Sequence, residues 1–101
     1  MFIGMITRIF RVKIYQELKN EFEEKFATIS VTVVENAKGS ISETIYKPIK
    51  WSPNEYAMIS VWESEGALQA FVGEDWNRAF IPKEMEKFVA ECWVHHYESW
   101  E

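Results

Sequence analysis

The stretch Tyr56-Ala-Met-Ile-Ser-Val-Trp62 predicts the fold of this chain more clearly than any other. It is rich in β-branched and aromatic residues and follows a turn-forming segment, Ser-Pro-Asn-Glu, at 52–55. We therefore expect a β-strand over 56–62. Successive side chains alternate between faces, Tyr56, Met58 and Trp62 lying opposite Ala57, Ile59 and Val61. Apolar side chains on both faces indicate a strand that is covered on both sides.

The N-terminal region predicts a second strand of the same kind. Residues 2–13 (FIGMITRIFRVK) also carry apolar side chains on both faces. The chain has 101 residues, so we expect a single domain over 1–101, in which helices can cover one face of a sheet. Five Trp and 48% hydrophobic residues are more than a solvated monomer of this size needs. The sheet of a second copy is the economical cover for the other face, so we expect a homodimer.

A long helix over residues 16–36 is expected between these two strands. Apolar side chains recur every three or four residues, at Leu18, Phe22, Phe26, Ile29, Val33 and Ala37. Gly39 is a natural stop for this helix. Residues 29–34 also have strand propensity. The alternative is therefore a helix that ends near Thr28, followed by a short strand.

The rest of the chain completes a β-α-β-β-α-β order. Two further strands are expected, an edge strand over 41–50 and a strand over 92–100. Between them we expect a helix that Ser64 caps and Gly73 ends, a helical turn over 75–80, and a helix that Pro82 opens. This order is that of an α+β, ferredoxin-like fold.

Composition excludes several classes of function. The net charge is −5 and no basic face is visible, which argues against nucleic-acid binding. No apolar run approaches the roughly 20 residues of a membrane span, and the N-terminus does not look like a signal peptide. The lone cysteine, Cys92, reads as a buried hydrophobe, and no residues have metal-ligand spacing. We expect a cytoplasmic protein with no metal and no cofactor.

The segment 55–73 carries a recognisable pattern. A strand ends in Trp62-Glu63-Ser64, a helix with Ala-Leu-Gln-Ala-Phe at 67–71 follows, and Gly73 comes next. With the first strand and the long helix, this resembles the antibiotic biosynthesis monooxygenase (ABM) family over nearly the whole chain. The resemblance implies a dimeric α/β barrel, in which two ferredoxin-like sheets pack face to face with their helices outside. Members include cofactor-independent oxygenases of aromatic polyketides, haem-degrading monooxygenases, and small proteins with no known activity.

The chain departs from both catalytic patterns that the resemblance brings with it. In the haem-degrading branch an Asn, a Trp and a His form the site, and this sequence has Thr7, Phe71 and Ile81 there. Haem degradation by that mechanism is therefore not expected. The quinone-forming oxygenases share Trp62, but the Asn four residues before it is Met58 here.

Three residues are candidates for catalysis. Trp62 is expected to stack on a substrate, the alternative being a core anchor. His95 and His96 are adjacent on a predicted strand and so point to opposite faces. One of them is expected to line the pocket and act as a base near neutral pH. The alternative is that both are structural or solvated.

Further residues are expected to bind the substrate. Trp76 would form a lid and Asn77 or Arg78 would orient a polar substrate, the alternative being a helix cap and a solvated turn. Arg8 lies in an apolar strand, where it either pairs with a carboxylate such as Glu43 or Glu98 or holds an anionic ligand. The full expected set is Trp62, Trp76, Asn77, Arg8 and Tyr56.

Three functional hypotheses follow, in order of preference. The first is a cofactor-independent monooxygenase, of the ABM kind, that acts on a small aromatic substrate. The second is a non-catalytic dimer that binds a small molecule in the same pocket. The third is haem binding through His95 or His96 without degradation.

Overall fold

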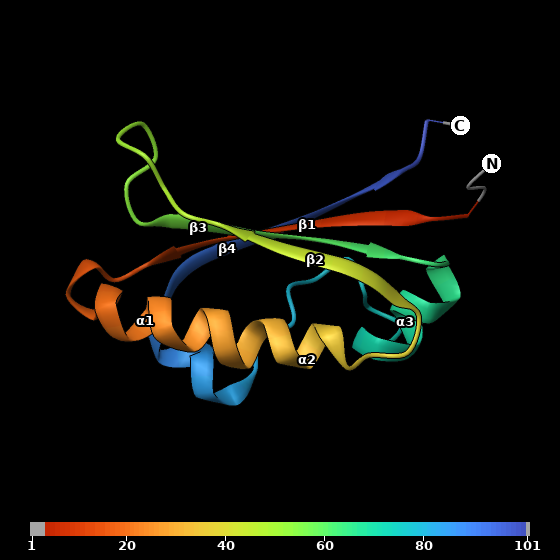
Figure 1. The fold of residues 1–101 in the computed structure, drawn as a ribbon, viewed down its shortest axis with the longest axis horizontal. Helices are drawn as coiled ribbons and strands as arrows, with labels where there is room; N and C mark the ends of the chain where they lie inside the picture. The colour runs from red at the N-terminus through yellow and green to blue at the C-terminus, as the bar shows by residue number, and fades with distance from the viewer. Residues whose placement is uncertain (1–3, 101) are drawn as a thin grey trace.

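The computed structural model describes residues 4–100 as a four-stranded antiparallel sheet with helices against one face (Figure 1). The strands are β1 (Ile6–Ile14), β2 (Ser40–Tyr46), β3 (Glu55–Trp62) and β4 (Val89–Glu98), in the spatial order β2-β3-β1-β4. This α+β, ferredoxin-like arrangement is the fold that the sequence predicted. No helix within 4–100 is long and apolar enough to cross a membrane.

Strand boundaries differ from the expected ones at several ends. β1 begins at Ile6, and residues 2 and 3 of the expected strand lie outside the described part of the chain. β2 ends at Tyr46, and residues 47–54 form a loop that rises on the side of the sheet away from the helices (Figure 1). β4 begins at Val89 rather than at 92, because Val89 still pairs with Ile14 across an irregularity in β1.

The long helix over 16–36 is confirmed, and the alternative strand after Thr28 is wrong. The helix runs as a 3₁₀ turn (η1, Gln16–Leu18), α1 (Lys19–Lys25), a π-helical turn (η2, Phe26–Ser30) and α2 (Val31–Glu35). The wider π turn inserts extra chain and rotates the buried side. Ser30 is therefore buried, whereas Ile29, which the helical spacing placed in the core, is only half-buried.

The second helical region is correct at its start and wrong over 75–80. Ser64 caps α3 (Glu65–Val72), its Oγ accepting a hydrogen bond from the Ala67 N–H at 3.0 Å, and Gly73 follows with a φ of +99°. The expected helical turn over 75–80 does not form, and the chain makes irregular turns there. The carbonyls of residues 76 and 78 instead accept hydrogen bonds from a side chain of β1, described below. The helix expected after Pro82 is present, as a 3₁₀ helix (η3, Lys83–Phe88).

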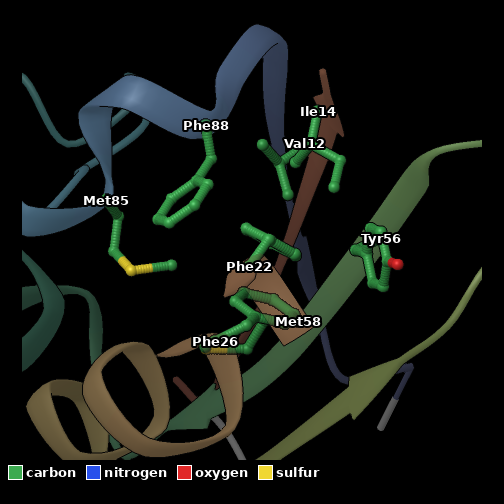
Figure 2. Close-up of a cluster of buried hydrophobic side chains, with 8 residues drawn as sticks. All are labelled: Val12, Ile14, Phe22, Phe26, Tyr56, Met58, Met85 and Phe88. Atoms are coloured by element: carbon green, nitrogen blue, oxygen red, sulfur yellow. The ribbon is translucent and has the colours of Figure 1, made fainter. Parts of the chain in front are cut away.

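The core lies between the sheet and the helices. Its main cluster, shown in Figure 2, consists of Val12, Ile14, Phe22, Phe26, Tyr56, Met58, Met85 and Phe88. The Phe22 ring centroid lies 4.8 Å from that of Phe26 and 4.7 Å from that of Tyr56, which ties the long helix to the sheet. A smaller cluster of Ile6, Trp62 and Leu68 holds α3 against the other end of the sheet.

The opposite face of the sheet carries no helix. Its side chains include the half-buried Ile9, Ile59 and Val61 and the exposed Trp93 and Tyr97. Ile9 and Ile59 are direct partners on β1 and β3. The alternation predicted from the sequence, apolar on both faces, is thus confirmed for the central strands. This open face combines these apolar and aromatic side chains with Thr7, Arg11 and His95, and the described chain leaves it uncovered.

Candidate functional site

A pocket lies between the helix-facing side of the sheet and the helices, where the two core clusters meet. Its walls are mainly aromatic and aliphatic, with aromatic rings contributed by Phe10, Phe22, Phe26, Trp62, Phe71 and Phe80. The cavity volume is about 50 Å³, enough for a few water molecules and smaller than the roughly 150 Å³ that holds a benzene ring. Three polar side chains also reach its lining, those of Arg8, Ser30 and Ser60.

Arg8 is the charged group of this pocket. Only 6% of its surface is exposed, because it stands in the middle of β1 on the helix-facing side. Its Nη1 donates to the Trp76 carbonyl at 2.7 Å and its Nη2 to the Arg78 carbonyl at 2.9 Å. Burial lowers the pKa of Arg8 to about 10, so the guanidinium still carries its charge at neutral pH.

The expected pairing of Arg8 with a carboxylate is wrong. Glu43 accepts a hydrogen bond from Ser40 Oγ at 3.0 Å instead, and Glu98 is exposed near the end of β4. Within the described residues 4–100, no acidic side chain forms an ion pair with Arg8.

His96 lies directly behind Arg8. Its Nε2 is 2.8 Å from Arg8 Nη1, and its ring meets the Trp76 ring edge-on with centroids 4.6 Å apart. A guanidinium can only donate, so Nε2 accepts and the ring proton sits on Nδ1. Burial, with the charge of Arg8 and the neighbouring His95, lowers the pKa of His96 to about 4. His96 is therefore neutral at physiological pH, and its Nε2 lone pair is already used.

His95 faces the other way, as expected for neighbours on a strand. It is exposed on the open face of the sheet, paired in register with Ile9. The pocket lies on the opposite face, and His95 is not among its lining residues.

Trp62 is a core anchor, which was one of the two alternatives that the sequence offered, and its role toward a substrate stays a prediction. It is fully buried in the smaller core cluster and also forms part of the pocket wall. Its ring stacks on Phe71, with centroids 5.2 Å apart and 30° between the planes. The indole N–H donates to Ser60 Oγ at 3.0 Å, which fixes the ring orientation.

Of the remaining expected residues, Trp76 alone approaches the Arg8 cluster. Its half-buried ring packs on His96, and its carbonyl is held by Arg8. Asn77 is exposed in the same loop. Tyr56 belongs to the main core cluster, where its hydroxyl donates to Glu23 at 2.6 Å, and it does not line the pocket. Burial and the Glu23 carboxylate together raise the pKa of the Tyr56 phenol above its ordinary value.

Of the pocket-lining residues, the sequence pointed only to Arg8 and Trp62, and among those it missed are Ser30, Ser60 and Phe80. Ser60 had a usable signal, because it is the polar residue on the otherwise apolar even-numbered face of β3. Ser30 had none, because only the π-helical turn brings it to the buried side. Phe80 lies in the irregular segment where a helical turn was expected, and its ring packs against Phe71 at 5.2 Å.

The sequence profile of the antibiotic biosynthesis monooxygenase family matches residues 5–83 of this chain. The chain belongs to the ABM family. The match covers the first three strands, the long helix and α3, which together carry most of the pocket. No curated protein sequence matches the chain.

Several solved structures share the fold of this ABM-family chain. SnoaB from Streptomyces nogalater, a cofactor-independent oxygenase, has a TM-score of 0.74 at 15% identity, with 97% of this chain and 95% of SnoaB covered. The heme-degrading protein Rv3592 from Mycobacterium tuberculosis has a TM-score of 0.64 at 21% identity, with coverage of 96% and 95%. At these identities the likeness establishes the fold alone. Within residues 4–100, no three His, Cys, Asp or Glu side chains gather as a metal site would require.

Proposed function

We propose that this ABM-family chain is a cofactor-independent monooxygenase that oxidises a small aromatic substrate in the pocket beneath the sheet. The observation that carries the proposal is the pocket itself, whose mainly aromatic lining suits a flat ring once the exposed Phe80 makes room for it. The similarity of the fold to SnoaB, a cofactor-independent oxygenase, supports the proposal further.

The reaction needs no added reductant if the substrate supplies all the electrons. A phenol and dioxygen together have the atoms of a quinone and one water molecule. The ring loses four electrons, one oxygen atom becomes the new carbonyl, and the other leaves as water. The protein's share would be to orient the ring and exclude bulk water, which the mostly apolar lining favours.

The candidate residues take different parts in this proposal. Trp62 and Phe71, stacked on each other, would form an aromatic wall, and Phe80, which is exposed and packs on Phe71, would stand at the mouth. His96 would position Arg8 rather than take a proton, because its Nε2 already accepts from the guanidinium. Trp76 would shield this pair from solvent. His95, Asn77 and Tyr56 have no direct part in it.

We also propose that the protein functions as a homodimer through the open face of its sheet. That face presents Ile9, Ile59, Val61, Trp93 and Tyr97 beside the polar Thr7, Arg11 and His95, and no element within residues 4–100 covers it. Exposed apolar areas of this kind mark interaction surfaces. The pocket lies on the other side of the sheet, so each copy would keep its own.

Oxygen consumption tests the enzymatic proposal. Purified, chelator-treated protein would be given 1-naphthol, 1,5-dihydroxynaphthalene or anthrone in an oxygen-electrode cell without flavin or metal. The expected result is protein-dependent uptake, with one labelled oxygen atom in the product when heavy-isotope dioxygen is supplied. Trp62→Leu should lower the rate, while Trp100→Leu, which removes an exposed tryptophan near the C-terminus, should not.

The same measurements separate the alternatives. If ring compounds bind but none consumes oxygen above the protein-free rate, the chain is a non-catalytic binding protein. Equal rates for Trp62→Leu and the wild type would place the reaction outside this pocket. Haem binding predicts a shifted Soret band on adding haemin. The engaged Nε2 of His96 argues against ligation by that residue in this arrangement.

A further inference from the structure

Arg8 is a buried cation whose hydrogen-bond partners are all neutral. Two of them are the backbone carbonyls of Trp76 and Arg78, and the third is the uncharged imidazole of His96. Taking a charge out of water is costly unless an opposite charge lies close by. Within residues 4–100 no carboxylate supplies that charge. The charge of Arg8 therefore has no counter-charge among the described residues.

The geometry leaves part of the guanidinium free. Its three hydrogen bonds use three of the five N–H donors of an arginine. Among the described residues, the remaining two donors have no acceptor, and the side chain contributes to the pocket lining. An acceptor that enters the pocket can therefore reach a charge that is already held in place.

Ser60 stands beside Arg8 on the same face. The two residues are direct partners on β3 and β1, and His96 is the partner of Arg8 on β4, so a polar row crosses the sheet. Ser60 Oγ accepts from the Trp62 indole at 3.0 Å, which leaves its own hydroxyl proton free to donate. Arg8 and Ser60 both line the pocket, whereas most other lining residues are apolar.

We propose that the pocket selects an aromatic monoanion, whose negatively charged oxygen, a carboxylate or an ionised phenol, binds to Arg8 and Ser60. The ring then lies against the aromatic side of the pocket lining, of which the stacked Trp62 and Phe71 rings form part. This inference rests on the proposed function, since it names the class of substrate for the same pocket. It makes Arg8 the residue that determines specificity, and His96 the residue that positions Arg8.

Electrostatics favour an anion here over a neutral ring of the same shape. An ion pair in a mostly apolar cavity is stronger than one in water, and hydrogen bonds to a charged oxygen are stronger than neutral ones. Glu43 is the acidic residue nearest in the polar row, as the β2 partner of Ser60, and it is engaged with Ser40. A neutral ligand would fill the apolar walls but leave the charge of Arg8 uncompensated.

A pair of near-isosteric probes tests the inference without any turnover. The dissociation constants of 2-naphthoate, an anion at pH 7.5, and 2-naphthamide, which is neutral, would be measured by titration calorimetry under nitrogen. Wild-type protein should bind the naphthoate about tenfold more tightly or better, the ratio expected when the amide lacks one charged hydrogen bond. In Arg8→Gln this preference should fall to near unity, while naphthamide binding changes little.

Two further variants keep the test decisive. Lys13→Gln removes one positive charge from an exposed site on the same strand and should keep the wild-type preference. If Arg8→Gln does not fold, the wild-type ratio still decides, and Ser60→Ala should lower that ratio by a smaller factor. The inference is overturned if wild-type protein binds the amide as tightly as the acid or binds neither probe at millimolar concentration. Survival of the preference in Arg8→Gln would also overturn it.

Failure of this inference and failure of the oxygenase proposal give different results. An anion preference that depends on Arg8, with no phenol consuming oxygen, would leave the inference standing and remove the enzymatic activity. Oxygen uptake with a neutral ring, without an anion preference, would keep the activity and remove the role assigned to Arg8.

Discussion

Nη1 of Arg8 lies 2.8 Å from Nε2 of His96, and this contact fixes the state of both side chains. The guanidinium can only donate, so the imidazole must be neutral and must carry its proton on Nδ1. A protonated His96 would have no lone pair for Arg8 and would place two positive charges side by side. The cluster therefore requires an uncharged histidine at the pH at which the pocket is intact.

The free energy of unfolding should fall as acid protonates His96. Its pKa in the folded protein is about 4, below the ordinary value of 6.5, because of burial and then the charge of Arg8. Between these two pH values the unfolded chain binds the proton more readily than the folded one. The stabilising contribution is thus fully present above pH 6.5 and is lost as the pH falls toward 4. Thermal unfolding followed by circular dichroism across this range should show the decline.

Two histidine variants isolate the cause of this decline. His96→Gln keeps an acceptor for Arg8 but does not titrate, so its melting temperature should fall less steeply between pH 6.5 and 4. His95→Gln, exposed on the other face of the sheet, should keep most of the wild-type slope. Equal slopes for His96→Gln and the wild type would assign the acid sensitivity to other groups.

Gly39 should tolerate no side chain, because its backbone and its surroundings both oppose one. Its φ is +90°, and a Cβ built there would lie 2.5 Å from the Cβ of Ala67 on α3. Gly39→Ala should lower the free energy of unfolding by about 1–3 kcal/mol, measured by urea denaturation. Gly73→Ala is the matched control, since its φ is +99° but no atom lies within 4 Å.

A double variant tests the steric part of that cost. Ala67→Gly removes the atom that the new Cβ would meet, although glycine itself weakens a helix by roughly 0.5–1 kcal/mol. The loss in Gly39→Ala/Ala67→Gly should therefore be smaller than the sum of the two single losses. If the losses in the free energy of unfolding are additive, or equal for Gly39→Ala and Gly73→Ala, then α3 moves to admit the new Cβ without measurable cost.

Much of the fold could be predicted because the strongest patterns are local. The alternation around Trp62 and the long apolar face through Phe22 and Phe26 are enforced by the same periodicities that build strands and helices. The segment 75–80 could not be predicted, because its conformation depends on distant hydrogen bonds. The carbonyls of Trp76 and Arg78 accept them from Arg8, which lies 68 and 70 residues earlier in the chain. Ser30 was missed because a π-helical turn rotates it to the buried side of the helix, and no pattern in the sequence predicted that turn.

The site was predictable only in part, because it too depends on contacts between residues that are distant in the chain. The sequence marked Arg8 as unusual within an apolar strand, but it could not choose between a carboxylate partner and a ligand. That choice depends on which side chains the sheet register places beside it, namely Ser60 and His96. The alternation of His95 and His96 was visible, whereas the engagement of His96 Nε2 was not.

Ser60 should contribute to stability through the indole of Trp62. The Trp62 N–H is fully buried and donates to Ser60 Oγ at 3.0 Å, so Ser60→Ala leaves it without that acceptor. The expected loss in the free energy of unfolding is about 1–3 kcal/mol, measured by chemical denaturation. Ser42→Ala, on exposed β2, is the control and should change little.

A double-mutant cycle checks that this loss comes from the hydrogen bond. Trp62→Phe removes the N–H, so adding Ser60→Ala to it should cost less than the same change in the wild type. Strictly additive losses would show that Ser60 acts through packing alone.

The open face of the sheet should hold two copies together, and Ile59 lies in its middle. Ile59 is the strand partner of Ile9 on β1 and of Thr44 on β2, so a charge placed there would be buried in any face-to-face dimer. Two copies would also bring two such charges close to each other, which is unfavourable in a partly dry interface.

Light scattering after size exclusion should give wild-type protein twice the chain mass of 12.0 kDa and Ile59→Glu the single mass. Gln69→Glu, which adds the same charge to the exposed surface of α3, should remain dimeric. Because Ile59 faces away from the core between sheet and helices, the far-ultraviolet dichroism of Ile59→Glu should stay that of a folded chain. A wild-type mass of 12.0 kDa at micromolar concentration, or an Ile59→Glu protein that still pairs, would mean that the open face has another use.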